Sequence, residues 1–101
     1  MEKEKIILIK NRLNDFTNIK FPVSPESNDV QRSTIFADLA LLETQLIGLL
    51  QSLVGSYKFV DHEEKLFNVL RFDLKENLKK LDNNDEIALY FKQLLDIVEL
   101  I

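Results

Sequence analysis

The densest group of side chains able to do acid–base or metal chemistry lies at residues 61–64, with the sequence DHEE, and contains the only histidine of the chain. Carboxylates beside an imidazole could hold a metal ion or form an acid–base pair. Metal sites in helical bundles place Glu and His three residues apart, whereas Phe59 stands three residues before His62. An HExxH zinc motif is excluded because Leu66 stands four residues after His62. Acids also gather at helix N-termini, where they cap amide groups, so we expect that role and no metal.

Nucleophilic catalysis has little support in the sequence. The chain has no cysteine, so a serine would have to pair with His62, and no serine has a suggestive context. Gly48 and Gly55 are the only glycines and form neither a P-loop nor a dinucleotide-binding fingerprint. These absences predict a protein that is not an enzyme and uses no cofactor.

Glu43 is the most informative single acid, because it falls within the apolar arc of an expected helix, on the face of Leu39, Leu46 and Leu50. A buried carboxylate without a partner is costly, and its pKa rises. Three positions are open for Glu43: the edge of the core with the carboxylate in water, a buried contact with a Lys or Tyr of a neighbouring helix, or a subunit or partner interface. Because acids are rarely fully buried, the first is favoured.

Val69 and Phe72 form a candidate protein-binding site, because both point away from the core stripe of their expected helix. Three charged side chains are expected around them: Lys65, Glu76 and Lys79. An exposed aromatic residue with an aliphatic neighbour and a charged rim is typical of a protein-docking site. The alternative is that another helix covers this pair, since each bundle helix has two neighbours. Leu89 and Leu100, off the core face of the last helix, could extend the same surface.

Four amphipathic segments, joined mainly by short turns, would position these residues. The first helix is expected over about residues 2–18, although its apolar run at residues 6–9 could also open as a strand. Residues 19–29 hold both prolines and should be extended. We expect the apolar side chains of this link to pack across the end of the bundle; they are Ile19, Phe21 and Val23.

The second helix is bounded by capping signals. Ser24 and Pro25 have the form of an N-cap and a first-turn proline, so the helix could begin at residue 25, with Asp29 or Ser33 as alternative caps. Gly55, just past the last apolar residue, predicts its end.

Two further cap pairs predict the starts of the last two helices. Asp61 and Glu64 form an Asp version of the capping box, with Val60 as its hydrophobic staple, so the third helix should cover about residues 62–80. After a turn at residues 82–85, Asn83 and Glu86 form a second pair, and the fourth helix should run to the end of the sequence.

Each expected helix has one apolar face. The predicted core residues are Ile6, Ile9, Leu13 and Phe16; Phe36, Leu39, Leu42, Leu46, Leu49, Leu50 and Leu53; Leu66, Phe67, Leu70, Leu74, Leu78 and Leu81; and Ile87, Tyr90, Phe91, Leu94, Val98 and Ile101. This pattern predicts an all-α fold, an antiparallel four-helix bundle forming a single domain over residues 1–101. The alternative is a three-helix core with a loosely attached or swapped N-terminal helix.

Residues 35–54 are apolar over a length that would fit a transmembrane helix. Asp38 and Glu43 lie inside this stretch, and an acid near the centre of a membrane helix costs about 2.5–3.5 kcal/mol, against about 0.3–0.6 gained per large aliphatic residue. No basic cluster flanks the stretch. We therefore expect the central helix of a soluble bundle and no membrane span.

Composition narrows the possible partners and location. The chain has 101 residues with a net charge of −4, and this acidic excess disfavours nucleic acid, whose binding requires many lysines and arginines. The absence of cysteine fits a reducing compartment, and the N-terminal sequence is unlike a secretory signal, so we expect a cytoplasmic protein.

The sequence thus predicts a small protein that acts by binding another protein, as an inhibitor, immunity factor, adaptor or regulator. The alternative is an assembly subunit whose surplus of apolar residues at 35–54 is satisfied by self-association, for example as a homodimer.

Overall fold

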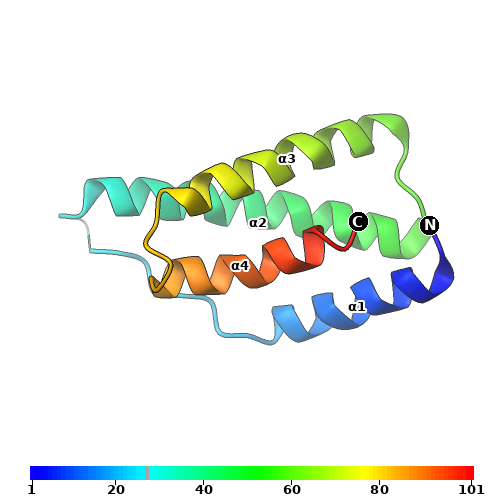
Figure 1. The fold of residues 1–101 in the computed structure, drawn as a ribbon, viewed down its shortest axis with the longest axis horizontal. Coiled ribbons are helices and arrows are strands. Elements are labelled where there is room, and N and C mark those ends of the chain that lie inside the picture. The colour runs from blue at the N-terminus through cyan, green and yellow to red at the C-terminus, as the bar shows by residue number, and fades with distance from the viewer. Residues whose placement is uncertain (27) are drawn as a thin grey trace.

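The computed structural model describes residues 1–26 and 28–101, and within them it contains four α-helices and no strand. The helices are α1 (Lys3–Thr17), α2 (Val30–Ser56), α3 (Asp61–Lys79) and α4 (Glu86–Val98). Successive helices run in opposite directions along the molecule (Figure 1). The all-α fold predicted from the periodicity of apolar residues is confirmed.

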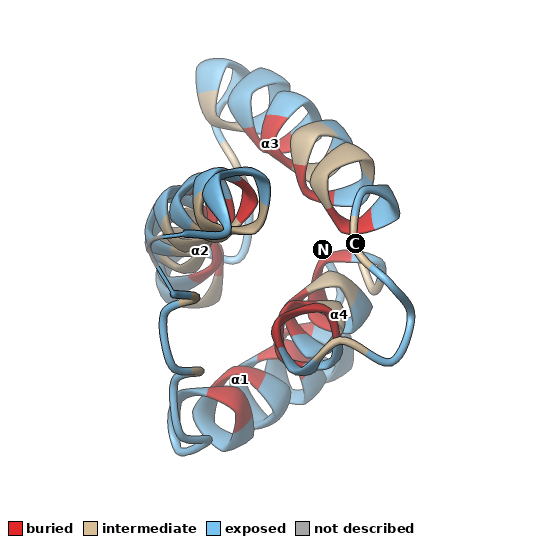
Figure 2. Cartoon of the chain, turned by 90° about the vertical axis from the view of Figure 1, so that its left-hand side faces the viewer, coloured by how far each residue is buried: buried red, intermediate tan, exposed pale blue. Residues whose placement is uncertain are grey.

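The four helices surround one core. α2 contacts each of the other three helices, and α4 does the same, whereas α1 and α3 lie diagonally opposite and do not touch within the described part of the chain. Figure 2 looks along the bundle and shows the buried residues facing its interior. The fold is an antiparallel four-helix bundle. The alternative with a loose or swapped first helix is wrong, because α1 packs against α2 and α4 of its own chain.

The core follows the predicted apolar faces closely. Every described residue that is buried is hydrophobic, and all four core residues predicted for α1 are among them. Leu66 is the clear error: it is 44% exposed, because it lies about 80° around α3 from the centre of the buried stripe. Several predicted core residues are half-buried at the margin of the core instead: Phe36, Leu49, Leu81 and Ile101.

Neither end of α2 lies where the favoured sequence signals predict it. The cap is Asp29, one of the two alternatives to Ser24, and its Oδ1 accepts a hydrogen bond of 3.1 Å from the backbone N–H of Arg32. At the other end the helix continues through Gly55 to Ser56, and Tyr57 takes the left-handed conformation with a φ of 66°. Its backbone N–H still reaches the carbonyl of Leu53, at 2.7 Å, so the chain turns without glycine at the usual position.

The starts of α3 and α4 are each displaced from the predicted caps. Val60 occupies the N-cap of α3, and Glu63 Oε1 accepts a hydrogen bond of 3.1 Å from its backbone N–H, so the pair of Asp61 and Glu64 is wrong by one residue. Asp85, not Asn83, caps α4 by accepting from the backbone N–H of Ile87 at 2.9 Å. The helix ends at Val98, three residues before the predicted end.

The link between α1 and α2 is only partly packed. Phe21 lies in an aromatic cluster, with its ring centroid 5.4 Å from that of Tyr90 and 5.6 Å from that of Phe36. Val23 is 80% exposed, so the prediction that it packs across the bundle end is wrong. Ser27 lies outside the described residues.

α2 is long and apolar enough, by length and composition, to cross a membrane; among the described helices it is the only one that meets this test, which core helices of soluble proteins also pass. Leu39, Leu46 and Leu50 on its most apolar face are fully buried. Helices α1, α3 and α4 therefore cover that face within the chain.

Candidate functional site on the outer face of α3

Val69 and Phe72 lie on the face of α3 that points away from the bundle. Phe72 is 61% exposed and Val69 is 57% exposed, whereas Leu70 and Leu74 on the opposite face are buried. Each residue turns about 100° around a helix, so Phe72 stands nearly opposite the centre of the buried stripe. The alternative that another helix covers this pair is wrong within the described structure.

Leu66 extends the exposed pair into a continuous strip, which we call the outer α3 strip: Leu66, Val69 and Phe72. Residues three positions apart are neighbours on a helix surface, so the three side chains adjoin. The sequence analysis places Leu66 in the core beside Phe67, and the structure buries Phe67 alone of the two. The spacing of three residues from Leu66 to Val69 and from Val69 to Phe72 is the signal that assigns Leu66 to the exposed face.

Charged residues border the outer α3 strip as predicted. Lys65 and Lys79 are exposed, and Glu76 is partly exposed. Lys79 Nζ lies 3.1 Å from Glu76 Oε1, an ion pair between residues three apart on the same helix. Surface pairs of this kind contribute little to stability, so these groups can rearrange at small cost when a partner binds.

Glu43 lies elsewhere, between α2 and α4. It is half-buried, and its Oε1 accepts a hydrogen bond of 2.5 Å from the hydroxyl of Tyr90. Burial raises the pKa of Glu43, and the hydrogen bond from Tyr90 partly offsets that rise. The pKa of Tyr90 is raised as well, by burial and by the hydrogen bond to this carboxylate. Glu43 thus combines two of its predicted positions, the core edge and a contact with a neighbouring tyrosine.

The acidic segment around His62 forms the first turn of α3. His62 is exposed there, and Glu63 uses one carboxylate oxygen for Val60 and the other for Ser52, whose hydroxyl donates at 2.9 Å. These hydrogen bonds lower the pKa of Glu63. Among the described residues no group of three or more His, Cys, Asp or Glu side chains is placed to hold a metal ion.

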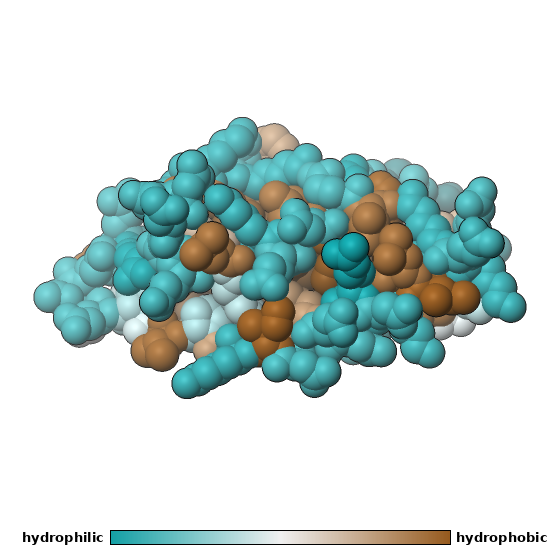
Figure 3. Space-filling model, turned by 60° about the horizontal axis from the view of Figure 1, so that its bottom comes forward, coloured by the Kyte–Doolittle hydropathy of each residue, from teal (hydrophilic) through white to brown (hydrophobic). Residues whose placement is uncertain are grey.

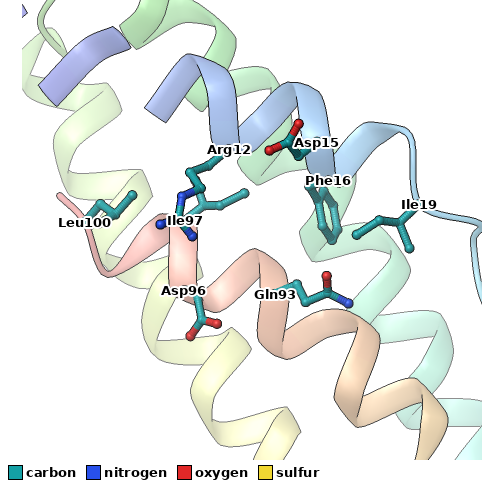
Figure 4. Close-up of a pocket in the computed structure, with 8 residues that line it drawn as sticks. All are labelled: Arg12, Asp15, Phe16, Ile19, Gln93, Asp96, Ile97 and Leu100. Atoms are coloured by element: carbon teal, nitrogen blue, oxygen red, sulfur yellow. The ribbon is translucent and has the colours of Figure 1, made fainter. Parts of the chain in front are cut away.

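A groove of about 400 Å³ between α1 and α4 was not predicted from the sequence. Phe16 and Ile97 supply its buried apolar part, and the polar groups around it come from Arg12, Asp15, Gln93 and Asp96 (Figure 4). Its lining contains two carboxylates and one guanidinium but no histidine, so the groove has no acid–base pair of the imidazole type.

A second groove, of about 390 Å³, lies between the link at residues 19–23 and α4. Leu89, Val23 and Phe21 are exposed in or beside it, which makes it the more apolar of the two. Seen with the α1 side turned forward, the surface is mainly hydrophilic with separate apolar patches (Figure 3).

Comparison with known proteins found no match to the chain among protein-family models, curated proteins or solved structures.

Proposed function

We propose that the chain is a cytoplasmic, non-catalytic protein-binding module that docks on its partner through the outer α3 strip, as an inhibitor, immunity factor, adaptor or regulator does. The observation that carries the proposal is the exposure of Phe72, 61%, on the face opposite the core. An aromatic side chain held by a rigid helix loses little conformational freedom on binding. Val69 and Leu66 supply the adjoining apolar area.

A partner that covers the outer α3 strip would bury apolar area that is exposed to water in the free protein. Fully burying a large apolar side chain stabilises by about 1.5–3 kcal/mol, and all three residues of the strip keep a large part of that area in water. The charged side chains at its margin, Lys65 and Glu76, would exclude water around the anchor and restrict which partners fit. The core does not depend on Leu66, Val69 and Phe72, so the free energy gained by burying these side chains can contribute to binding.

The test compares two variants whose parent residues are both exposed. Phe72 is 61% exposed, and Ile7 is 46% exposed but lies on α1, diagonally opposite α3. Proteins captured from the native host by the immobilised wild type should be lost with Phe72→Ser and kept with Ile7→Ser. Both variants should retain the helical circular dichroism of the wild type. Capture that is equally strong with Phe72→Ser would contradict the proposal.

A second candidate function, self-association, is favoured by the outward face of α2. Leu41 is exposed there, and its neighbours Ala37, Thr44 and Gly48 carry no charge, so Asp38 is the one charged side chain adjoining it on that face. A second copy of the chain could cover the uncharged part of this surface and leave the Asp38 carboxylate in water at its margin. Light scattering at about 10 µM should then report a dimer for the wild type and a monomer for Leu41→Glu. A wild type that stays monomeric excludes this candidate.

A further inference from the structure

Charge is segregated in this protein. Residues 65–80 hold five basic side chains and two acids, whereas the rest of the chain holds eight and fifteen. The part of α3 after its acidic first turn is therefore net positive together with Lys80, in a protein whose net charge is −4. A positive face on an acidic protein attracts acidic surfaces.

A groove of about 260 Å³ between α3 and α4 concentrates this charge. Its lining residues come from both helices and the turn between them: Lys75, Leu78, Lys79, Asn83, Lys92 and Leu95. Three ammonium groups thus surround an apolar floor. No acid is among the described residues that line the groove, but Glu99 and Glu76 lie beside it and pair with Lys75 and Lys79. The groove matches a ligand that presents carboxylates around an apolar side chain.

The lysines of the groove are held only by surface contacts. Lys75 Nζ lies 2.5 Å from Glu99 Oε1, and both side chains are more than two-fifths exposed. Lys92 Nζ lies 3.3 Å from the amide oxygen of Asn83. Such exposed pairs contribute little, so a partner's carboxylates can replace them at small cost.

The groove and the outer α3 strip form one continuous surface. Phe72 precedes Lys75 by three residues and Lys79 by seven, so all three side chains fall on the same side of α3. The exposed anchor therefore stands within about two helical turns of the lysines, a distance that one short helix spans.

We infer that this surface binds an acidic, amphipathic helix of a partner protein, with apolar residues on Phe72 and in the groove floor and carboxylates on Lys75, Lys79 and Lys92. The inference rests on the proposed function and names the chemistry of its partner. Helices that dock in grooves present apolar anchors three, four and seven residues apart, which matches the spacing on α3.

Two other anionic partners fit the surface less well. Nucleic acid would pair its phosphates with the lysines, but Phe72, Val69 and the leucine floor would gain nothing from a phosphate backbone. An anionic membrane is broad and flat, whereas Lys92 and Leu95 line a concave groove. An acidic helix uses both the apolar and the basic parts.

The test is a phage-displayed selection of random peptides of about 16 residues, a length that forms a helix on binding, against the wild type. Selected peptides should be enriched in Asp and Glu around large apolar anchors. A synthetic copy of a selected peptide should bind the variant Lys75→Glu/Lys79→Glu/Lys92→Glu about tenfold or more weakly. Its affinity for the wild type should also fall as NaCl rises from about 50 to about 300 mM.

A matched control separates the groove from net charge. Lys3, Lys5 and Lys10 are exposed on α1, and their replacement by Glu changes the net charge equally. This control variant should bind the peptide within about twofold of the wild type. If the groove variant loses its helical circular dichroism, Lys75→Gln/Lys79→Gln/Lys92→Gln removes the charge without reversing it and serves instead.

The outcomes distinguish the two proposals. Selected peptides that lack acids but need Phe72 overturn the acidic-partner inference and leave the proposed function standing. Peptides that bind Phe72→Ser as well as the wild type overturn both. Failure to select any peptide overturns the inference, as does groove-dependent binding of phosphatidylserine vesicles or a single-stranded RNA in place of peptides.

Discussion

The hydroxyl of Tyr90 donates a hydrogen bond of 2.5 Å to Oε1 of Glu43, joining α4 to α2 across a diagonal of the bundle. Phe16 and Phe91 pack on the Tyr90 ring, with centroids at 5.0 and 4.9 Å, so the hydroxyl is held in place. Burial raises the pKa of Glu43 above its usual value, and this single hydrogen bond works against that rise. The pair therefore makes stability depend on pH.

Glu43→Gln should make the protein more stable than the wild type near pH 7. Because the folded-state pKa of Glu43 is raised, its contribution to stability is fully present below the unfolded pKa and is lost as pH rises through the folded value. The glutamine keeps an oxygen that accepts from Tyr90 but carries no charge. Urea unfolding should show the gain at pH 7 and its disappearance near about pH 4. A difference that is constant with pH would contradict this assignment.

Tyr90→Phe should destabilise the protein by about 1–2 kcal/mol, because it leaves a part-buried carboxylate without its donor. The effect should be smaller in the Glu43→Gln background, where no charge remains to be stabilised. A double-mutant cycle from chemical denaturation measures this coupling. Additive effects of the two substitutions would show that the hydrogen bond contributes nothing beyond the packing of the ring.

The sequence predicted the number and inner faces of the helices, because helical periodicity depends only on local spacing. It predicted their antiparallel directions because the connections between them are mainly short. It could not predict the partner of Glu43, since Tyr90 stands 47 residues away and the pairing depends on how α2 and α4 rotate against each other. The lysine groove was missed for the same reason: Lys92 joins Lys75 and Lys79 only after the helices pack. The predicted N-cap of α3, Asp61, is one residue away from the observed N-cap, Val60. The sequence did not indicate Val60 because the hydrogen bond at this cap is accepted by the Glu63 side chain and not by a side chain of the cap residue.

Truncating the two phenylalanines of α3 to alanine should change the free energy of unfolding by very different amounts. Phe67 is 2% exposed and packs against Phe59, with ring centroids 5.0 Å apart, so Phe67→Ala should cost about 3–5 kcal/mol. Phe72 faces water, so Phe72→Ala should change the free energy of unfolding by no more than about 0.5 kcal/mol. Thermal or urea unfolding measures both. A large loss for Phe72→Ala would mean that its side chain belongs to the fold, and the docking proposal would lose its support.

The ion pair between Arg32 and Asp85 should stabilise the protein with the opposite pH dependence. Arg32 donates to both carboxylate oxygens, at 2.8 and 2.9 Å, and lowers the pKa of Asp85. The contribution is therefore present above the unfolded pKa of Asp85 and is lost as pH falls through its lower folded value.

Two substitutions at position 85 separate the charge from the cap. Asp85→Asn keeps an oxygen for the backbone N–H of Ile87 and should cost at most about 1 kcal/mol at pH 7, because the Arg32 side chain is 37% exposed. Asp85→Ala should cost about 1 kcal/mol more, since it also removes the cap of α4. Unfolding curves between neutral and acidic pH should show the Asn penalty shrinking as pH falls, and an unchanged penalty would argue against the ion pair.

Gly48→Ala should stabilise the chain by about 0.5–1 kcal/mol, because glycine in a helix interior costs that much relative to alanine. Apart from the adjoining residues and the backbone of α2 itself, no atom lies within 4 Å of the position that an added methyl group would occupy, and the backbone of Gly48 is not left-handed. Gly55, with equally open space near the end of α2, provides the comparison. If copies of the chain associate through the outward face of α2, the methyl group at position 48 would stand in the contact and weaken the dimer while strengthening the monomer. Unfolding together with light scattering measures both quantities, and a loss of monomer stability would contradict the open space around Gly48.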